Sequence, residues 1–359
     1  MPPRPAKAAG RGGDESGAAR ERAAVRILIV KLSSLGDVVH AMPVVHDILQ
    51  ARPGAAIDWV VEPAFAPLVA RVEGIGEVIE LPLRRWTREG WWRPNARAEA
   101  RSFVQRLRRV RYDAVLDLQG LTKSALVAAL ARGPSYGLAN RTAGSSHEWP
   151  ARWLATNAVR VVRRSHALDR ARELAAAALG TSTDAPPSFG LRPRTAAAPE
   201  RTVVLVHGTT RADKLWPDAS WIELGRRLVD QGWNVALPQS DGVEAARARS
   251  IAAAVGGGSS AVWPAMELGA FIDRLAACAG AVGVDSGPSH IAVALGLPHV
   301  QIYNFPTAWR TGPQPRHGAG LQVAIEGDPT PTVAAVWSAW NRVQDAARAD
   351  GGDNARVAR

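Results

Sequence analysis

The sequence predicts an α/β fold made of two doubly wound domains, each built around a mainly parallel sheet. Short apolar runs alternate with amphipathic segments through most of the 359 residues, which is the pattern of strands connected and covered by helices. The pattern stops at residues 181–200, where Pro, Ser, Thr and Ala dominate, and then starts again. We therefore predict a linker there and a ligand cleft between the two domains.

The predicted domain boundaries follow from the same pattern. We expect an N-terminal domain at 25–180 and a C-terminal domain at 201–345, which ends in a closing helix whose apolar stripe begins at Val333. Residues 1–24 are rich in Gly, Ala, Arg and Pro without apolar periodicity, so we interpret them as a disordered basic tail. We interpret 346–359 as a flexible tail.

The individual elements are predicted from apolar periodicity and turn residues. Active residues are expected at the carboxyl ends of the strands. In the first domain we expect strands at 25–30, 57–61, 78–82 and 114–118, and helices at 38–49, 98–109, 125–130 and 166–179. In the second we expect strands at 203–206, 233–237, 282–284 and 299–303, and helices at 220–231, from 242 onward and at 268–277.

Composition excludes several classes of protein. No uncharged apolar run reaches the roughly 18 residues of a membrane span, and the first 26 residues hold no hydrophobic signal segment. Cys278 is the only cysteine, which excludes an intramolecular disulfide and a cysteine metal cluster. We expect a cytosolic protein in which Cys278 belongs to the core.

Positive charge is concentrated in one segment of a chain whose formal net charge is +11. Between residues 84 and 111 there are ten arginines and two glutamates, with Trp86, Trp91 and Trp92 among them. This mixture suits an interfacial or anion-facing surface, although a solvated basic helix is the alternative. We recognise no nucleic-acid-binding module, so nucleic acid is not the expected partner.

The stretch 282–290 predicts an anion site. An apolar strand ends at Asp285 and becomes a helix in which Ser286 or Gly287 is the N-cap and Pro288 lies in the first turn. Free backbone amides and the helix dipole at such an end favour a phosphate. The alternative is an ordinary connection between a strand and a helix.

Further residues extend this hypothesis to a diphosphate. The chain has neither a Gly-x-Gly-x-x-Gly fingerprint after a strand nor a Walker A loop, so dehydrogenase and P-loop chemistry are not expected. Clustered metal ligands are absent from the sequence, so we expect no obligatory metal and no cofactor. Lys214 could neutralise the diphosphate, and Thr209 and Thr210 could donate hydroxyl hydrogen bonds to it.

Several residues keep two interpretations. Asp37 follows the first strand and could be a general base for an attacking hydroxyl or a helix cap. His290 could contact the donor ligand or simply pack in the core. Lys31 and Lys123 could bind anionic acceptor groups or form local ion pairs.

Four ordered motifs closely resemble those of the lipopolysaccharide heptosyltransferases of glycosyltransferase family 9, from about Val25 to Trp340. Arg84-Arg85-Trp86 and the motif at Asp117 resemble most closely the type I members, which add the first heptose to Kdo on lipid A. The four motifs are Ile27 to Val38, Asp117 to Ser124, Thr209 to Pro217 and Val284 to His290. Asn304 to Trp309 departs from the family pattern, so that loop is left out of the predicted site.

The resemblance implies a GT-B fold and a metal-independent, inverting transfer from ADP-heptose. It implies an acceptor site on the N-terminal domain, with Asp37 as the catalytic base, and a donor site on the C-terminal domain, with Lys214 on the diphosphate. The implied donor-binding residues are Thr209, Thr210, Lys214, Glu244, Met266, Asp285, Ser286, Gly287 and His290. The implied acceptor-binding residues are Lys31, Arg84, Arg85, Arg88 and Lys123.

The implied partners are ADP-heptose, Kdo-lipid A and the cytoplasmic leaflet of the inner membrane, on which the protein would rest. Two alternatives stay open. One is a type II or III enzyme that acts on an already heptosylated core, and the other is a non-catalytic protein that binds a nucleotide sugar.

Overall fold

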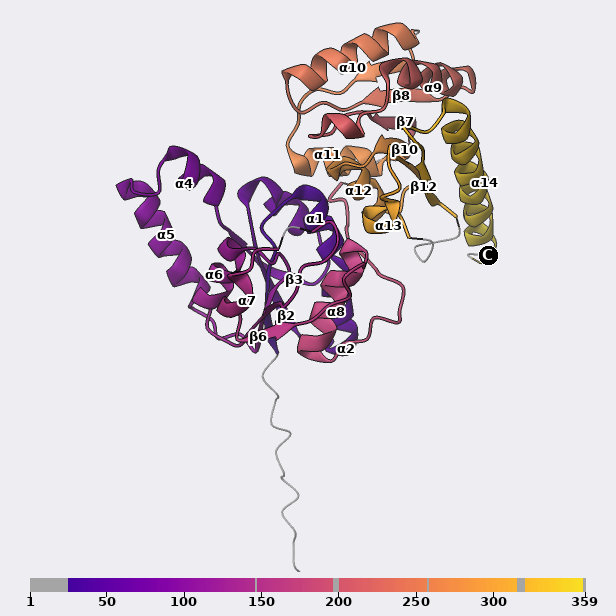
Figure 1. Ribbon diagram of the computed structural model, residues 1–359. Helices are drawn as coiled ribbons and strands as arrows, with labels where there is room; N and C mark the ends of the chain where they lie inside the picture. The colour runs from indigo at the N-terminus through magenta and orange to yellow at the C-terminus, as the bar shows by residue number, and fades with distance from the viewer. Residues whose placement is uncertain (1–24, 146, 196–199, 257, 315–319, 358–359) are drawn as a thin grey trace, which may run out of the picture.

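A computed structural model describes residues 25–145, 147–195, 200–256, 258–314 and 320–357, and for 351–357 the backbone alone (Figure 1). The predicted basic tail at 1–24 lies outside the described residues. Within them, no helix is long and apolar enough to cross a membrane.

The N-terminal domain is built on a six-stranded parallel sheet with the order β3-β2-β1-β4-β5-β6. Its central strand β1 is buried on both faces, because Ile27 and Ile29 pack in one core cluster and Leu28 and Val30 in another. The strands are β1 Arg26–Val30, β2 Ala56–Val61, β3 Ile75–Glu80, β4 Ala114–Asp117, β5 Ser135–Leu138 and β6 Asn157–Val159. The helices are α1 Leu35–Ala41, α2 Pro43–Ala51, η1 Pro63–Phe65, α3 Ala66–Val69, α4 Leu83–Glu89, α5 Pro94–Leu107, α6 Thr122–Leu130, α7 Ala151–Leu154 and α8 Ala167–Leu179.

The C-terminal domain repeats this plan with the order β12-β11-β10-β7-β8-β9, again with parallel neighbours. The strands are β7 Glu200–Val206, β8 Asn234–Leu237, β9 Ser260–Val262, β10 Cys278–Val284, β11 His299–Tyr303 and β12 Gln322–Glu326. The helices are η2 Ala212–Lys214, α9 Asp218–Asp230, α10 Gly242–Val255, α11 Leu268–Ala276, α12 Gly287–Ala294, α13 Ala308–Thr311 and α14 Val333–Val357. The prediction of two doubly wound α/β domains is confirmed.

Strand order fixes where ligands bind. In each sheet the chain starts at a central strand, moves to one edge and then returns to the other side, so the order reverses between β1 and β4 and between β7 and β10. In open α/β sheets, ligands bind beyond the carboxyl ends of the strands at such a reversal. The fold therefore offers one binding position per domain.

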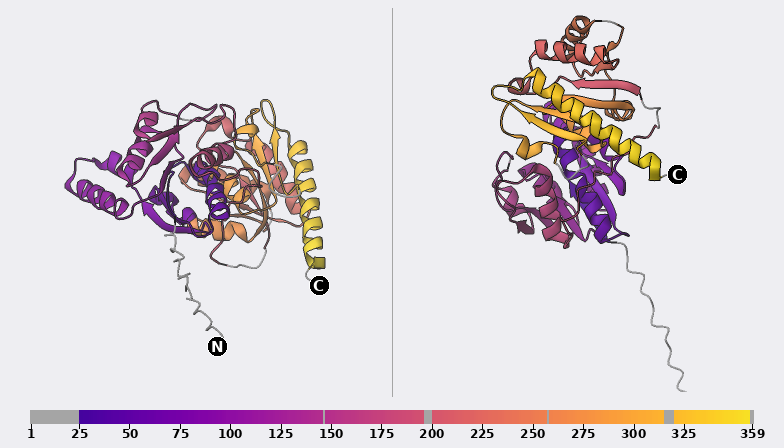
Figure 2. Two further views of the ribbon diagram at one scale, coloured as in Figure 1. Left: turned by 90° about the horizontal axis from the view of Figure 1, so that it is seen from below. Right: turned by 90° about the vertical axis from the view of Figure 1, so that its right-hand side faces the viewer.

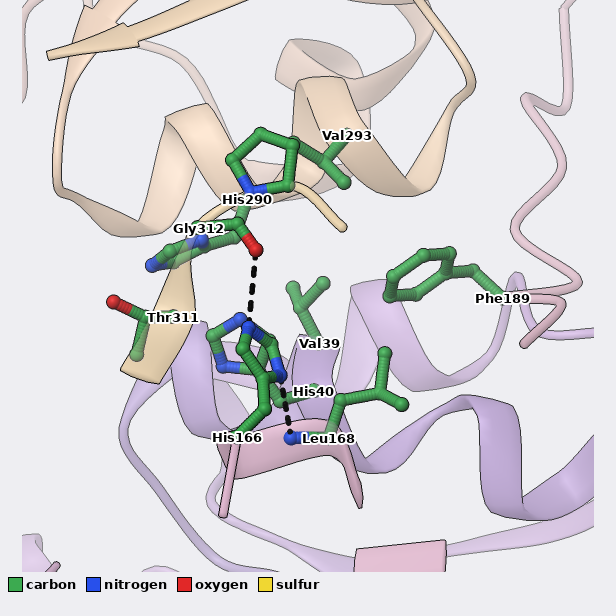
Figure 3. Close-up of a pocket in the computed structure, with 10 residues that line it drawn as sticks. Val39, His40, His166, Leu168, Phe189, His290, Val293, Thr311 and Gly312 are labelled. Carbon is green, nitrogen blue, oxygen red and sulfur yellow. Dashed lines mark hydrogen bonds between the residues drawn. The ribbon is translucent and has the colours of Figure 1, made fainter. Parts of the chain in front are cut away.

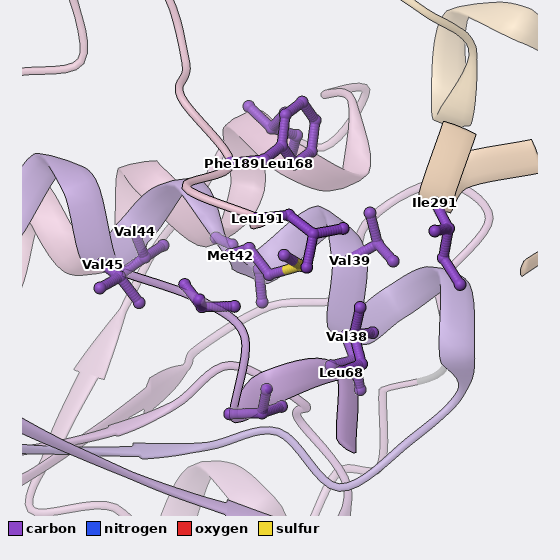
Figure 4. Close-up of a cluster of buried hydrophobic side chains, with 14 of the residues drawn as sticks. Val38, Val39, Met42, Val44, Val45, Leu68, Leu168, Phe189, Leu191 and Ile291 are labelled. Atoms are coloured by element: carbon purple, nitrogen blue, oxygen red, sulfur yellow. The ribbon is translucent and has the colours of Figure 1, made fainter. Parts of the chain in front are cut away.

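The two domains share a continuous hydrophobic core. Val38, Val39 and Met42 of the N-terminal domain belong to the same buried cluster as Ile291 of α12 and Leu191 of the predicted linker (Figure 4). A second cluster covers the opposite face of the N-terminal sheet under α5 and α6. A third lies between the C-terminal sheet and helices that include α9 and α14, and α14 runs along the outside of the domain (Figure 2).

The structure differs from the expected elements in several places, including short helices such as α3, α4, α7 and α13 that were not predicted. The helix expected at 38–49 is two helices, α1 and α2, because Pro43 begins the second and has no N–H for a bond to the first. Four short strands, β5, β6, β9 and β12, were not predicted. The closing helix α14 continues to Val357, twelve residues beyond the predicted domain end at 345, and the flexibility of the segment from residue 346 stays a prediction.

Candidate functional site

The sheet reversal points of the two domains meet through α1 and α12. A Cβ atom placed on Gly36 would lie 2.6 Å from His290 Cδ2, and one placed on Gly287 would lie 2.5 Å from Leu35 Cδ2. Both distances are closer than real Cβ contacts, so the absence of side chains at Gly36 and Gly287 allows the two helices to approach. The predicted base, Asp37, therefore lies at the interface with the predicted donor helix.

Asp285 connects three groups of the predicted donor site. Lys214 Nζ donates to Oδ2 at 2.5 Å, while His290 Nε2 and Thr311 Oγ1 lie 3.2 Å and 3.3 Å from Oδ1. Burial raises the pKa of the Asp285 carboxyl, but the hydrogen bonds and charges of His290 and Lys214 outweigh it and hold the pKa well below its usual range. The Asp285 carboxylate therefore stays ionised and holds Lys214 beside the carboxyl end of β10.

The first turn of α12 has the geometry expected of an anion site. Ser286 is its N-cap residue in an extended conformation, and Pro288 lies in the first turn. Ser286 Oγ is buried and has no hydrogen-bond partner among the described residues. Because the first amides of a helix also lack intrahelical partners, a hydroxyl and backbone donors are available together.

The remaining predicted donor residues lie around the same sheet edge. Thr209 and Thr210 follow β7, and Thr210 is exposed. A Cβ on Gly208 would overlap the Glu244 carboxylate, so this side chain lies directly against the loop. Glu244 Oε2 also accepts the Ser240 N–H at 2.7 Å. Met266 is partly buried against the shared core, just before α11.

Asp37 has a capping role as well as a position at the site. It is residue N3 of α1, and its Oδ2 accepts hydrogen bonds from Ser34 Oγ at 2.7 Å and from Ser34 N at 3.2 Å in a capping box. Burial raises the pKa of Asp37, but the charge of Lys31 and the hydrogen bonds from Ser34 lower it by more. The net pKa is therefore below the usual value. The side chain is 41% exposed, so the ionised carboxylate remains accessible.

Lys31 is held by the protein itself. Its Nζ donates to Leu118 O at 3.0 Å and lies 3.9 Å from Asp37 Oδ1, and the residue is buried. Burial lowers its pKa. Its neighbour Asp117 is also buried, which raises the pKa of that carboxyl to about 6. In this arrangement the ammonium of Lys31 stabilises the Asp37 carboxylate, as the local ion-pair interpretation predicts.

The other predicted acceptor residues are spread over α4 and α6. The Arg84 guanidinium lies over the Phe65 ring at 5.6 Å, and the charges of Arg84 and Lys123 both act on the buried Glu62 carboxyl. Arg84 and Lys123 therefore both lie near the Glu62 carboxyl. Arg85 and Arg88 are exposed and pair instead with Glu99 of α5 and Glu89 of α4, respectively.

The sequence singled out His290, but not the two other histidines at the contact between the domains, His40 and His166. The His40 ring of α1 lies 4.4 Å from the His290 ring and 5.5 Å from the His166 ring. His166 Nε2 lies 3.0 Å from Gly312 O, and these side chains line a pocket between the domains (Figure 3). The spacing of His40, three residues after Asp37 on one helix face, was the signal available.

Arg170 was also missed. Its Nη1 donates to Thr142 Oγ1 at 3.0 Å, and its charge lowers the pKa of Asp37. The described part of the chain contains no group of three or more His, Cys, Asp or Glu side chains placed to hold a metal ion.

Comparisons with known proteins agree with this geometry. A model of glycosyltransferase family 9 (heptosyltransferase) matches residues 100–330. The chain is 38% identical over 284 residues to lipopolysaccharide heptosyltransferase 1 of Pseudomonas aeruginosa, with 78% of each chain covered. It is 37% identical over 295 residues to lipopolysaccharide heptosyltransferase 1 of Escherichia coli, covering 78% of this chain and 88% of that one.

Lipopolysaccharide heptosyltransferase 2 of Escherichia coli is less similar, at 29% identity over 299 residues, with 78% of this chain and 82% of that one covered. Among solved structures, Escherichia coli heptosyltransferase WaaC with ADP superposes with a TM-score of 0.78 at 33% identity, over 88% of this chain and 98% of that one. The same enzyme with ADP-2-deoxy-2-fluoro heptose gives a TM-score of 0.76 at the same identity and coverage.

Proposed function

The chain belongs to glycosyltransferase family 9, the heptosyltransferases, and from this premise we propose that it transfers heptose from ADP-L-glycero-D-manno-heptose to the Kdo of Kdo-lipid A, with inversion at the anomeric carbon. The protein is a glycosyltransferase with the GT-B fold. The observation that carries the proposal is the meeting of the Asp37 helix with the Lys214–Asp285–His290 group.

The donor site is proposed at the reversal point of the C-terminal sheet. Lys214 uses one of its three N–H donors on Asp285, so the others are free to bind the diphosphate. The first turn of α12 and the hydroxyl of Ser286 supply further donors. Glu244 lies against Gly208 in the adjacent loop, where a carboxylate can accept hydrogen bonds from ribose hydroxyls, and Met266 offers an apolar contact for adenine.

The proposed reaction is a single displacement. Asp37 accepts the proton of an acceptor hydroxyl, whose oxygen attacks the anomeric carbon of heptose as the bond from that carbon to the diphosphate oxygen breaks. ADP leaves with the bonding electron pair, and Lys214 with the α12 amides stabilises the charge that develops on it. Because attack and departure occur on opposite faces, the configuration inverts.

The acceptor is proposed to bind the N-terminal domain. Arg84 and Lys123, near Glu62, provide cations for the Kdo carboxylate and lipid A phosphates. Arg85 and Arg88 are exposed and could exchange Glu99 and Glu89 for the acceptor's anionic groups. The charge of this surface supports a location at the cytoplasmic face of the inner membrane.

Similarity favours the first heptose over the second. Identity is 37–38% to the type 1 enzymes of Pseudomonas and Escherichia and 29% to the Escherichia type 2 enzyme. A mass-spectrometric assay with ADP-heptose tests this choice when Kdo-lipid A and its heptosylated product are offered in parallel. Product from Kdo-lipid A alone is expected. Product from the heptosylated acceptor alone would indicate a type II or III enzyme. Donor binding without transfer to either acceptor would favour a non-catalytic protein.

A further inference from the structure

An exposed apolar surface lies on α6 and α7, apart from the donor and base residues. Leu126 and Leu130 of α6 are 49% and 42% exposed, and Trp149 and Trp153 at α7 are 61% and 63% exposed. The two helices pack against each other, so the four side chains belong to neighbouring segments, which we call the α6–α7 face. Large apolar groups gathered in this way mark an interaction surface.

Hydrogen bonds join the segment before α7 to the start of α6. Glu148 Oε2 accepts the Thr122 N–H at the start of α6 at 2.8 Å, and the Glu148 N–H donates to Gly120 O at 3.0 Å. The neighbouring rings of Trp149 and Trp153 lie 4.1 Å apart. Both tryptophan side chains remain exposed to solvent.

The charge of the segment that carries this face favours an anionic partner. Residues 122–164 contain seven lysines and arginines and one acidic residue, Glu148. A second copy of this chain would present the same positive charge and be repelled, whereas an anionic surface would be attracted. Tryptophan, with an apolar body and a polar N–H, is the side chain that settles at the boundary between lipid and water.

The face is continuous with the predicted acceptor site. Lys123, Leu126 and Leu130 follow one another at spacings of three and four residues, so they line one side of α6. Helices α5 and α6 also share a core cluster, and α4, α5, α6 and α7 lie on the same side of the N-terminal domain (Figures 1 and 2). The two other exposed tryptophans, Trp91 and Trp92, lie between α4 and α5.

We propose that the α6–α7 face docks the N-terminal domain onto an anionic lipid bilayer, with Trp149, Trp153, Leu126 and Leu130 entering the interfacial layer and the basic residues around them meeting the head groups. Docking in this orientation places Lys123 and the start of α6 beside the membrane from which a lipid-linked acceptor would project. This step rests on the proposed function for the identity of the acceptor, but the docking itself does not.

The test is co-sedimentation of the full chain with vesicles of phosphatidylcholine, with and without phosphatidylglycerol. We expect binding to the anionic vesicles, and a loss of about tenfold or more in apparent affinity when Trp149→Ser and Trp153→Ser are combined. Val243→Ser is the matched control, because Val243 is 83% exposed on the C-terminal domain. Leu126→Ser with Leu130→Ser gives a second variant, and circular dichroism checks that each is folded.

Equal vesicle binding by native and double-tryptophan protein would overturn the proposal, as would equal binding to neutral and anionic vesicles. A native dimer that the tryptophan variant splits, seen by sedimentation velocity, would instead assign the face to a second copy. Transfer of heptose to a Kdo saccharide without acyl chains separates this inference from the proposed function. The double-tryptophan variant should retain that transfer, because the saccharide does not have to be reached at a membrane. If native protein binds vesicles but transfers to no acceptor, the proposed function fails and the docking stands.

Discussion

Gly36 and His290 are in contact across the two domains, and there is no space between them for a single methyl group. A Cβ on Gly36 would lie 2.6 Å from Cδ2 of His290, a buried ring that Asp285 and His40 also contact. The domains approach closely at this point because residue 36 has no side chain.

We therefore expect Gly36→Ala to lower kcat/KM by on the order of 10²-fold, because it shifts the Asp37 helix away from α12. The thermal stability of the variant should fall only modestly, because overpacking against the His290 ring costs about 1–3 kcal/mol and the helix preference of alanine over glycine offsets about 1 kcal/mol of it. Gly54→Ala is the control, because nothing lies within 4 Å of its Cβ position. Unchanged kinetics in Gly36→Ala would show that this contact does not set the active geometry.

The two roles of Asp37 can be separated by substitution. Asp37→Asn keeps an oxygen that can accept from the Ser34 N–H but removes the carboxylate base, so transfer should fall by about 10²- to 10⁴-fold. Binding of ADP-heptose, measured by calorimetry, should persist because the donor residues are intact.

Ser34→Ala provides the complementary control. It removes the 2.7 Å hydroxyl bond to Asp37 and weakens the cap of α1, at a cost of about 1 kcal/mol, while the carboxylate remains. We expect it to retain most of the transfer activity. A loss as large as that of Asp37→Asn would mean that the cap, rather than the base, explains the effect.

Lys214→Ala should weaken donor binding through the diphosphate. Loss of hydrogen bonds from a charged group costs about 1.5–3 kcal/mol, so the affinity for ADP should fall by about 10- to 100-fold. The affinity for AMP should change less if Lys214 contacts the second phosphate. Equal losses for ADP and AMP would indicate that the substitution disturbs the loop, since it also frees Asp285 from its 2.5 Å partner.

Charge supplied by Lys214 and by the start of α12 also leads to a prediction about metal dependence. These groups can neutralise a leaving diphosphate without a bound ion. We expect transfer to remain largely intact after dialysis against EDTA. Complete loss that Mg²⁺ or Mn²⁺ restores would show that a metal takes part.

Secondary structure was predicted correctly where the local pattern of apolar residues matches the burial of the element in the fold. Central strands such as β1 are buried on both faces, so their apolar runs stand out, and β1, β4, β7 and β10 were all predicted. Two of the edge strands lack this signal: β6 and β9 have three residues each and no fully buried position. Turn chemistry correctly placed the start of α12, because Ser286 and Pro288 suit a helix N-terminus.

Contacts between distant segments could not be predicted in the same way. The donor group was proposed from the loop at Lys214 and the turn at Asp285, but the bond between these residues depends on β7 and β10 being neighbours in the sheet. The contact between His40 and His290 depends on how two domains pack, which no local spacing encodes. Likewise, the sequence left Asp37 as either cap or base, and the structure shows that capping and exposure coexist.

The buried histidines predict how stability responds to acid. Burial lowers the pKa of His299 from its usual 6.5 to about 3, and Nδ1 lies 2.9 Å from Ala281 O. Between those values the unfolded chain binds a proton that the folded chain does not, so stability is present above pH 6.5 and falls as the pH decreases. This histidine alone contributes a slope of about 1.4 kcal/mol per pH unit in that window.

The measurement is the free energy of unfolding from urea titrations between pH 7.5 and pH 5. His299→Asn keeps a donor near Ala281 O but does not titrate, so it should be less stable at pH 7.5 and lose less stability on acidification. His46→Asn, at a partly exposed position, is the matched control for the substitution itself. Burial also lowers the pKa of His40 and His207, so part of the native slope should remain in His299→Asn. An unchanged slope in that variant would contradict the assignment of a neutral His299 in the folded protein.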